Sequence, residues 1–196
     1  YLPPTSRVFN CGGGLGDLAI WLSYHVEEVT IIENDPKAVA ALRTRCPQNV
    51  VAILGDVHTY APDKLYDSLV LFDVGGAEET LPVVRELSRT KTFVLADLNT
   101  AAGEADLREL KETLNNAGIP FNYEAFEQEH VQPFRSREDA KSYFLFSLNR
   151  QLTEEELDHL LSESDDPELP YTHVEQKKIG MIVFDAANPA LKKPIL

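Results

Sequence analysis

Three glycines at G-x-G-x-G spacing, Gly12, Gly14 and Gly16, follow a short apolar run and precede an amphipathic segment. Glycine lets the chain turn with a positive φ and leaves no Cβ between the main chain and a ligand. The free N–H groups of the helix expected next point toward the same place. This glycine turn is therefore a candidate ligand cradle.

Carboxylates follow the other apolar runs of the N-terminal half. The acids that end these predicted strands are Glu33, Asp56, Asp73 and Asp97. The carboxyl ends of parallel strands meet at one edge of a sheet, where ligands of open α/β proteins bind. Aspartate is common in turns for structural reasons, but glutamate has no such advantage. An acid about 20 residues after a glycine turn can bind the hydroxyls of a ribose, so Glu33 indicates a nucleoside ligand.

The elements that must position these residues alternate between strands and helices. Strands are predicted at 7–11, 26–33, 49–54, 66–72 and 91–96, and helices at 15–25, 36–45, 77–88 and 101–117. Asp35 and Pro36 are suited to the start of the second helix, and Gly118 to the end of the last. This alternation predicts a parallel sheet with helices on both faces.

Two further stretches with strand character, 121–127 and 143–148, follow without a long helix between them. They predict an antiparallel edge. The expected fold is an α/β three-layer sandwich with a seven-stranded, mostly parallel sheet, an antiparallel last strand and helices on both faces. We assign residues 1–150 to this Rossmann-like domain.

The remaining segment, 151–196, differs in composition and is expected to form an acidic C-terminal appendage packed on the domain or extending from it. Residues 151–176 contain nine acids and no Lys or Arg. Thr153 with Glu156 predicts a capped helix at 154–162, and 179–184 could add one more strand. The appendage could be a solvated segment, a lid or the arm of a homodimer. The basic cluster at 134–141 is a solvated loop or a contact for a phosphate or carboxylate.

Composition narrows the class of protein. The net charge of −14 over 196 residues argues against non-specific binding to nucleic acid or to an anionic membrane, because both need a positive field. No apolar run approaches the roughly 20 residues of a membrane span. Two cysteines, Cys11 and Cys46, fit a reduced, cytoplasmic protein. The five histidines lack ligand spacing, so no metal site is expected. Because the chain begins just before the first strand, we expect a segment upstream of Tyr1.

Four motifs along residues 7–149 resemble those of the class I S-adenosylmethionine-dependent methyltransferases. The runs that carry the resemblance are Asn10-Cys11-Gly12-Gly13-Gly14-Leu15-Gly16 for motif I, Ile32-Glu33-Asn34-Asp35-Pro36 for motif II, Gly55-Asp56-Val57 for motif III and Leu71-Phe72-Asp73-Val74 at the position of motif IV. The dinucleotide fingerprint G-x-G-x-x-G would need a third glycine where Asp17 stands.

The resemblance implies S-adenosylmethionine as cofactor, S-adenosylhomocysteine as product, and a methyl acceptor that the acidic charge inclines toward a small molecule or a protein. It implies that Glu33 binds the ribose, that Asp56 meets the adenine amino group, and that the glycines lie near the methionine half. The cofactor-binding set is Asn10, Cys11, Gly12, Gly14, Gly16, Glu33, Asn34, Asp56, Val57 and Asp73. Asp73 is also the candidate catalytic base, with Asp97, His130 and Tyr143 as further candidates.

Two departures leave alternatives open. Asn10 stands where the family usually has an acid that helps hold the cofactor's ammonium group, a loss on the order of 1 kcal/mol. At motif IV, Asp73-Val74-Gly75-Gly76 replaces the Asn/Asp-Pro-Pro-Tyr signature of enzymes that methylate exocyclic amines. One alternative is a non-catalytic cofactor-binding or scaffold subunit. Another is a polyamine aminopropyltransferase, which needs an acid where Leu15 stands. A nicotinamide-dependent enzyme would need the third glycine.

Overall fold

The computed structural model describes residues 2–12, 16–148 and 150–192. The strands are β1 (Arg7–Cys11), β2 (Glu28–Glu33), β3 (Val50–Leu54), β4 (Tyr66–Phe72), β5 (Ser88–Asp97), β6 (Phe121–Phe134), β7 (Ser162–Glu163) and β8 (Tyr171–Asp185). The helices are α1 (Asp17–Ser23), α2 (Pro36–Arg45), α3 (Ala77–Leu87), α4 (Ala101–Asn116), α5 (Arg137–Leu148), α6 (Glu154–Leu160) and the 3₁₀-helix η1 (Pro189–Lys192). No helix of the described chain has the length and apolar character needed to cross a membrane.

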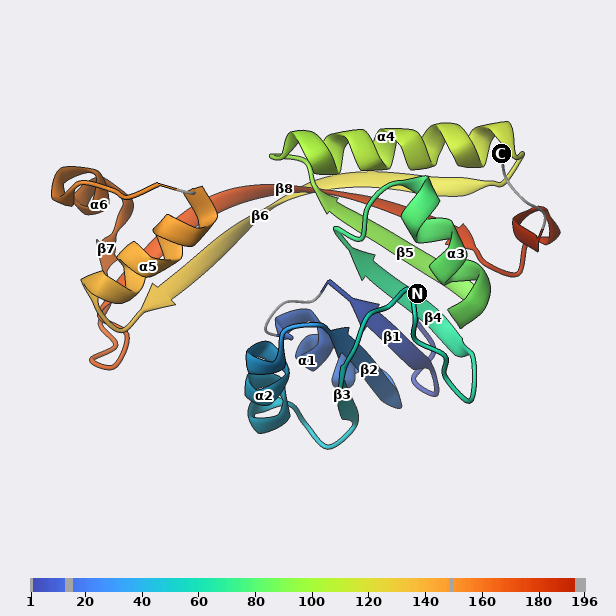
Figure 1. The fold of residues 1–196 in the computed structure, drawn as a ribbon, viewed down its shortest axis with the longest axis horizontal. Helices are drawn as coiled ribbons and strands as arrows, with labels where there is room; N and C mark the ends of the chain where they lie inside the picture. Colours follow the sequence, from blue (N-terminus) through green and yellow to red (C-terminus); the bar gives the residue numbers. More distant parts are fainter. Residues whose placement is uncertain (1, 13–15, 149, 193–196) are drawn as a thin grey trace. The chain divides into compact units, whose positions relative to one another are not determined.

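The strands form one mixed sheet in the order β3-β2-β1-β4-β5-β8-β6, with the short β7 paired to β8 (Figure 1). The first five strands run parallel, and β8 is antiparallel to β5. This confirms the predicted α/β fold with a mostly parallel sheet, although the described residues form eight strands where seven were expected. The strand order reverses between β1 and β4, because β1 pairs with β2 on one side and β4 on the other. Open α/β sheets bind ligands at such a switch point.

The chain divides into two compact units, which are described separately. Unit 1 is Tyr1–Phe126 with Ile179–Leu196, and unit 2 is Glu127–Lys178. The boundary expected at residue 150 therefore falls inside unit 2. The stretch 179–184, which the sequence offers as an additional strand, is the end of β8 and pairs along β5 from Lys91↔Asp185 to Asp97↔Ile179.

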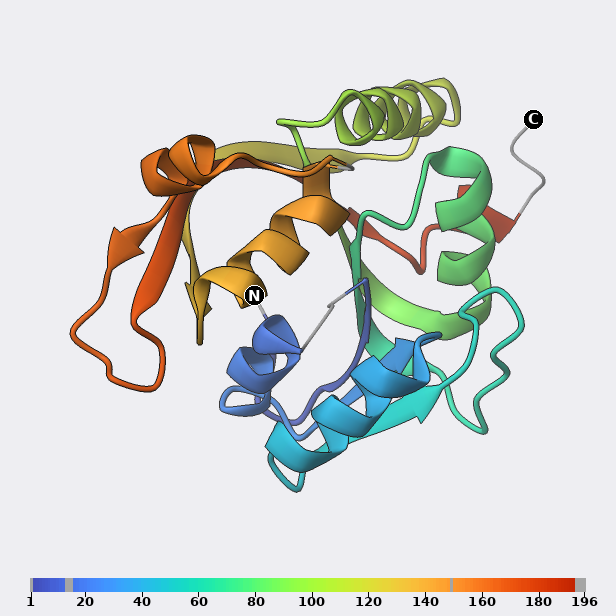
Figure 2. The same cartoon turned by 60° about the vertical axis from the view of Figure 1, so that its left-hand side comes forward.

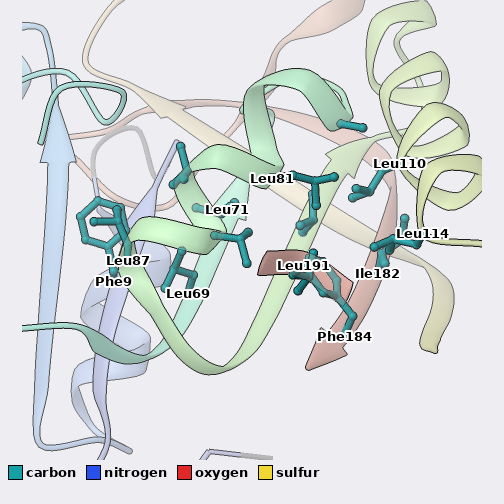
Figure 3. Packing of buried hydrophobic residues seen from close by; sticks show 14 of the residues in the cluster. Phe9, Leu69, Leu71, Leu81, Leu87, Leu110, Leu114, Ile182, Phe184 and Leu191 are labelled. Carbon is teal, nitrogen blue, oxygen red and sulfur yellow. The ribbon is translucent and has the colours of Figure 1, made fainter. Parts of the chain in front are cut away.

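Helices cover both faces of the sheet in unit 1 (Figure 2). On one face α1 and α2 contact β2 and β3, whereas α3 and α4 contact β4 and β5 on the other. Under α3 and α4, the largest apolar cluster joins β4, β5 and the end of β8 (Figure 3). Its fully buried leucines include Leu69 and Leu71 of β4 and Leu110 and Leu114 of α4.

The predicted helix caps are confirmed where the sequence places them. Asp35 Oδ1 accepts a hydrogen bond from Lys37 N at 2.8 Å, and Pro36 follows as the first residue of α2. Gly118, with φ +67, follows the end of α4. These caps fix where α2 and α4 begin or end, because they satisfy main-chain groups that the helix leaves unpaired.

In unit 2, the strand predicted at 143–148 is wrong, because these residues belong to α5. Ser136 starts this helix: its Oγ accepts from Asp139 N at 3.1 Å, and its carbonyl accepts from Ala140 N. Ala140 and Phe144, one turn apart, then face a small apolar core with Phe134 and Leu157. A short apolar run fits either element, and here the cap and this core decide for helix.

The acids of the predicted appendage are paired with the basic cluster at 134–141. Arg137 Nη2 lies 2.9 Å from Glu154 Oε2 and 2.6 Å from Asp158 Oδ1, and Lys141 also contacts Glu154. Glu156 completes the predicted capping box with Thr153. Two of the cations that the sequence offers as contacts for an anionic group, Arg137 and Lys141, are thus engaged by α6.

Glu156 connects the stability of α6 to pH. Arg150, which donates a hydrogen bond to it, and the main-chain N–H of Thr153 lower the pKa of Glu156 from an ordinary 4.5 to about 2. A lowered carboxyl pKa stabilises the folded state above pH 4.5, and this contribution is lost as the pH falls toward 2. We expect the hydrogen-exchange protection of α6, which compares its exchange rate with that of the unfolded chain at the same pH, to fall over that interval.

The matched variants are Glu156→Gln, which removes this dependence, and Glu155→Gln, which removes a charge from the same turn of α6. Glu156→Gln should reduce the loss of protection, although a part remains because Lys141 and Arg137 also lower the pKa of Glu154 in the same helix. Glu155→Gln should leave the loss of protection unchanged. Equal profiles for the two variants would contradict the assignment.

Candidate functional site

A pocket of about 440 Å³ opens in unit 1 at the carboxyl ends of four neighbouring strands. Residues from the ends of β1, β2, β3 and β4 line it, and we call it the crevice: Cys11, Gly12, Ile32, Glu33, Asn34, Gly55, Asp56, Val57, His58, Phe72, Asp73 and Val74. Seven of the ten sequence-predicted site residues are among these. Of the other three, Asn10 and Gly16 do not line the crevice, and Gly14 lies outside the described residues.

Gly12, directly after β1, lies against the main chain at the end of β4. Its φ is +78, and a Cβ built on it would lie 1.8 Å from the carbonyl oxygen of Phe72. The end of β1 therefore passes directly against the end of β4. Only glycine allows this close contact, which forms one wall of the crevice.

Replacing Gly12 tests how strictly the close contact with the end of β4 requires glycine. Gly12→Ala should lower the free energy of unfolding by both left-handed strain and a main-chain clash. Gly118→Ala is the matched control, because Gly118 has φ +67 and open space around its Cβ position, so it incurs only the strain, about 1–2 kcal/mol. We expect Gly12→Ala to cost at least ~2 kcal/mol more than the control in chemical unfolding. Equal costs would show that β1 and β4 can separate.

Gly16 has a packing role in the structure. It precedes α1 with φ +88, and a Cβ on it would lie 2.3 Å from Leu42 Cδ2 of α2. Because Gly16 has no side chain, the start of α1 can pack closely against α2. A role for Gly16 in binding a cofactor stays a prediction.

Two carboxylates of the crevice are oriented by their own turns. Glu33 Oε1 accepts from Asn34 N at 2.8 Å and from Asp35 N at 3.0 Å. Asp56 Oδ1 accepts from His58 N at 2.9 Å. The second oxygen of each carboxylate accepts no hydrogen bond within the part of the chain that the structure describes. One oxygen thus fixes the side chain, and the other can bind a ligand.

Asp73 is held at the β4–β5 edge of the crevice. Its main-chain N–H donates to Leu95 O at 3.0 Å, and its Oδ1 accepts from Asp97 N at 3.1 Å. Its φ of 49 is the one positive value among the described residues other than glycine. Aspartate tolerates this conformation better than most residues, and such strain is concentrated at functional sites.

Asn10 lies at the switch point between β1 and β4. Its side chain is fully buried, and Nδ2 donates to Val70 O of β4 at 3.2 Å. The other amide atom, Oδ1, is buried with no hydrogen-bond partner among the described residues. A buried acceptor without a donor is uncommon in native proteins.

Cys11 lines the crevice with an uncharged side chain. Burial raises the pKa of its thiol to about 11, the N–H of Gly12 opposes this shift, and the nearby Glu33 and Asp56 carboxylates add to it. The thiol therefore stays protonated at neutral pH and packs as a small apolar side chain.

Five lining residues were not predicted from the sequence: Ile32, Gly55, His58, Phe72 and Val74. Each adjoins a predicted residue at a strand end, so the position of the strand end was the available signal. Of the further catalytic candidates, Asp97 contacts Asp73, whereas His130 and Tyr143 belong to unit 2. No group of three or more His, Cys, Asp or Glu side chains in the described ranges could hold a metal ion.

No model of a known protein family matches the chain, and no curated protein sequence matches it. Solved structures do match its fold. Precorrin-6y C5,15-methyltransferase from Geobacter metallireducens is 12% identical with a TM-score of 0.58, over 93% of this chain and 81% of that one. Precorrin 8w decarboxylase from Methanobacterium thermoautotrophicum is 16% identical with a TM-score of 0.57, over 93% and 82%.

A third similar structure is the N-methyltransferase NodS from Bradyrhizobium japonicum, 11% identical with a TM-score of 0.53, over 93% of this chain and 86% of that one. Most of the similar structures are methyltransferases. At these identities the likeness concerns the fold, which is the Rossmann-like fold of these enzymes.

Proposed function

We propose that this chain is an S-adenosylmethionine-dependent methyltransferase and that the crevice holds the cofactor. The observation that carries the proposal is the meeting of Gly12, Glu33, Asp56 and Asp73 in one pocket at the switch point of the sheet. The fold shared with methyltransferases supports the same assignment.

The residues present fit an adenosyl group with an amino-acid tail. Glu33 Oε2 can accept hydrogen bonds from ribose hydroxyls, and Asp56 Oδ2 can accept from the adenine amino group, with the main-chain N–H of Val57 at the ring. Asn10, which the resemblance places at the ammonium group, is fully buried and does not line the crevice, so a role for it in holding the tail stays a prediction. The main chain at Gly12 lines the crevice and would lie beside the ligand.

The charge of the crevice favours this cofactor over a dinucleotide. Glu33, Asp56 and Asp73 line it, and none of its described lining residues is Lys or Arg. A pyrophosphate would meet like charges there, whereas the positive groups of S-adenosylmethionine would be attracted.

The bound cofactor supplies an activated methyl group, so the protein mainly has to align the acceptor and exclude water. Asp73, at the β4–β5 edge, can accept a proton from an acceptor that is a weak nucleophile. A small molecule or a protein as acceptor, a homodimer through the C-terminal segment and a cytoplasmic location all stay predictions.

Calorimetry with S-adenosylhomocysteine tests the binding half of the proposal. Glu33→Gln should weaken binding by roughly tenfold to a hundredfold, because hydrogen bonds to a charged acceptor are lost. Glu28→Gln is the control, since Glu28 opens the same strand at its opposite end and pairs with Arg7. No binding to the wild-type protein, or an equal effect of both variants, would contradict the proposal.

Asp73→Asn tests the catalytic half. Labelled methyl groups from S-adenosylmethionine are offered to a panel of small molecules and proteins, and the acceptor found for the wild type is then used with the variant. We expect turnover to fall by at least about a hundredfold while affinity for S-adenosylhomocysteine changes little. Unchanged turnover would remove Asp73 as the base. Binding without any transfer would favour the non-catalytic subunit.

A further inference from the structure

Among its described residues, the crevice has negatively charged lining side chains and no Lys or Arg. Three of its lining residues are carboxylates: Glu33, Asp56 and Asp73. Neither Glu33 nor Asp56 forms an ion pair with any described residue. A ligand in the crevice therefore experiences a negative field at short range.

The hydrogen-bonding groups around the crevice are also mostly acceptors. The main-chain N–H groups of Asn34, Asp35 and His58 are already used by Glu33 and Asp56. The carboxylate oxygens that these N–H groups leave open are acceptors, so a ligand that brings donors and positive charge would complement the crevice.

Methyl transfer changes the charge of the ligand by one unit. The bond between the methyl carbon and sulfur breaks, its electron pair stays on sulfur, and the acceptor's lone pair forms the new bond to carbon. A cationic sulfonium thereby becomes a neutral thioether. Both forms keep the same adenosine and the same amino-acid tail, so they differ at the crevice by one positive charge and one methyl group.

We infer that the crevice selects its ligand by charge and binds the sulfonium form more tightly than the neutral thioether. This inference rests on the proposed function. Glu33, Asp56 and Asp73 act as specificity determinants through their field, in addition to any hydrogen bonds they make. The product then leaves more easily than the cofactor, because transfer removes the charge that the field attracts.

Calorimetry on the full chain with S-adenosylmethionine and S-adenosylhomocysteine measures this selection as the ratio of the two dissociation constants. At low salt, where the Debye length is about 30 Å, we expect the sulfonium to bind roughly threefold to tenfold more tightly. At high salt, where the Debye length is about 3 Å, the ratio should fall toward one.

Glu33→Gln and Asp56→Asn separate charge from hydrogen bonding. Each variant weakens both ligands through lost hydrogen bonds, but only the loss of charge reduces the ratio between them. Glu112→Gln removes one charge from an exposed position on α4 and should leave the ratio at its wild-type value.

Three outcomes decide the inference. A ratio that favours the sulfonium, falls with salt and shrinks only in the crevice variants supports it. Equal affinities, or tighter binding of the thioether at low salt, overturn it while leaving the proposed function intact. If the wild-type protein binds neither ligand, the proposed function and the inference both fail.

Discussion

The close contact between the main chain at Gly12 and the end of β4 is the constraint on which the rest of the site depends. A Cβ at Gly12 would lie 1.8 Å from Phe72 O, so only glycine fits at this position. Two residues earlier, the side chain of Asn10 links the same two strands, because its Nδ2 donates a hydrogen bond to Val70 O. This contact lies at the switch point of the sheet, where ligands of open α/β proteins bind. It forms one wall of the crevice, and the acids at the ends of β2 and β3 line the crevice beside it.

The acids of the crevice are positioned by a simple local device. A strand ends, the chain turns, and one carboxylate oxygen is taken by the N–H groups of that turn, as in Glu33 and Asp56. This leaves the second oxygen in a defined direction and satisfies main-chain donors that the strand has left unpaired. Asp73 is tied instead to the neighbouring strand through Asp97 N. The orientation of the charges is therefore built into the sheet edge and does not require a ligand.

Unit 2 shows how an acidic segment can be structural. The acids of α6 pair with Arg137 and Lys141 of α5, and a four-residue apolar core of Phe134, Ala140, Phe144 and Leu157 holds the two helices together. The negative charge of the segment is thus partly used inside the unit. In unit 1, by contrast, the charge of the crevice has no such partners at Glu33 and Asp56, and it is available to a ligand.

The sequence by itself determined the elements of unit 1, their caps and the acids at the strand ends, because these depend on hydrophobic period and on capping residues within a few positions of one another. It therefore also located most of the crevice. The tertiary structure decided what depends on distant contacts: the insertion of β8 between β5 and β6, the helix at 137–148, the packing role of Gly16 beside Leu42, and the raised pKa of Cys11. The unpartnered Oδ1 of Asn10 belongs to this second group, since a residue's burial and its missing donor are set by neighbours 60 positions away, which no local pattern encodes.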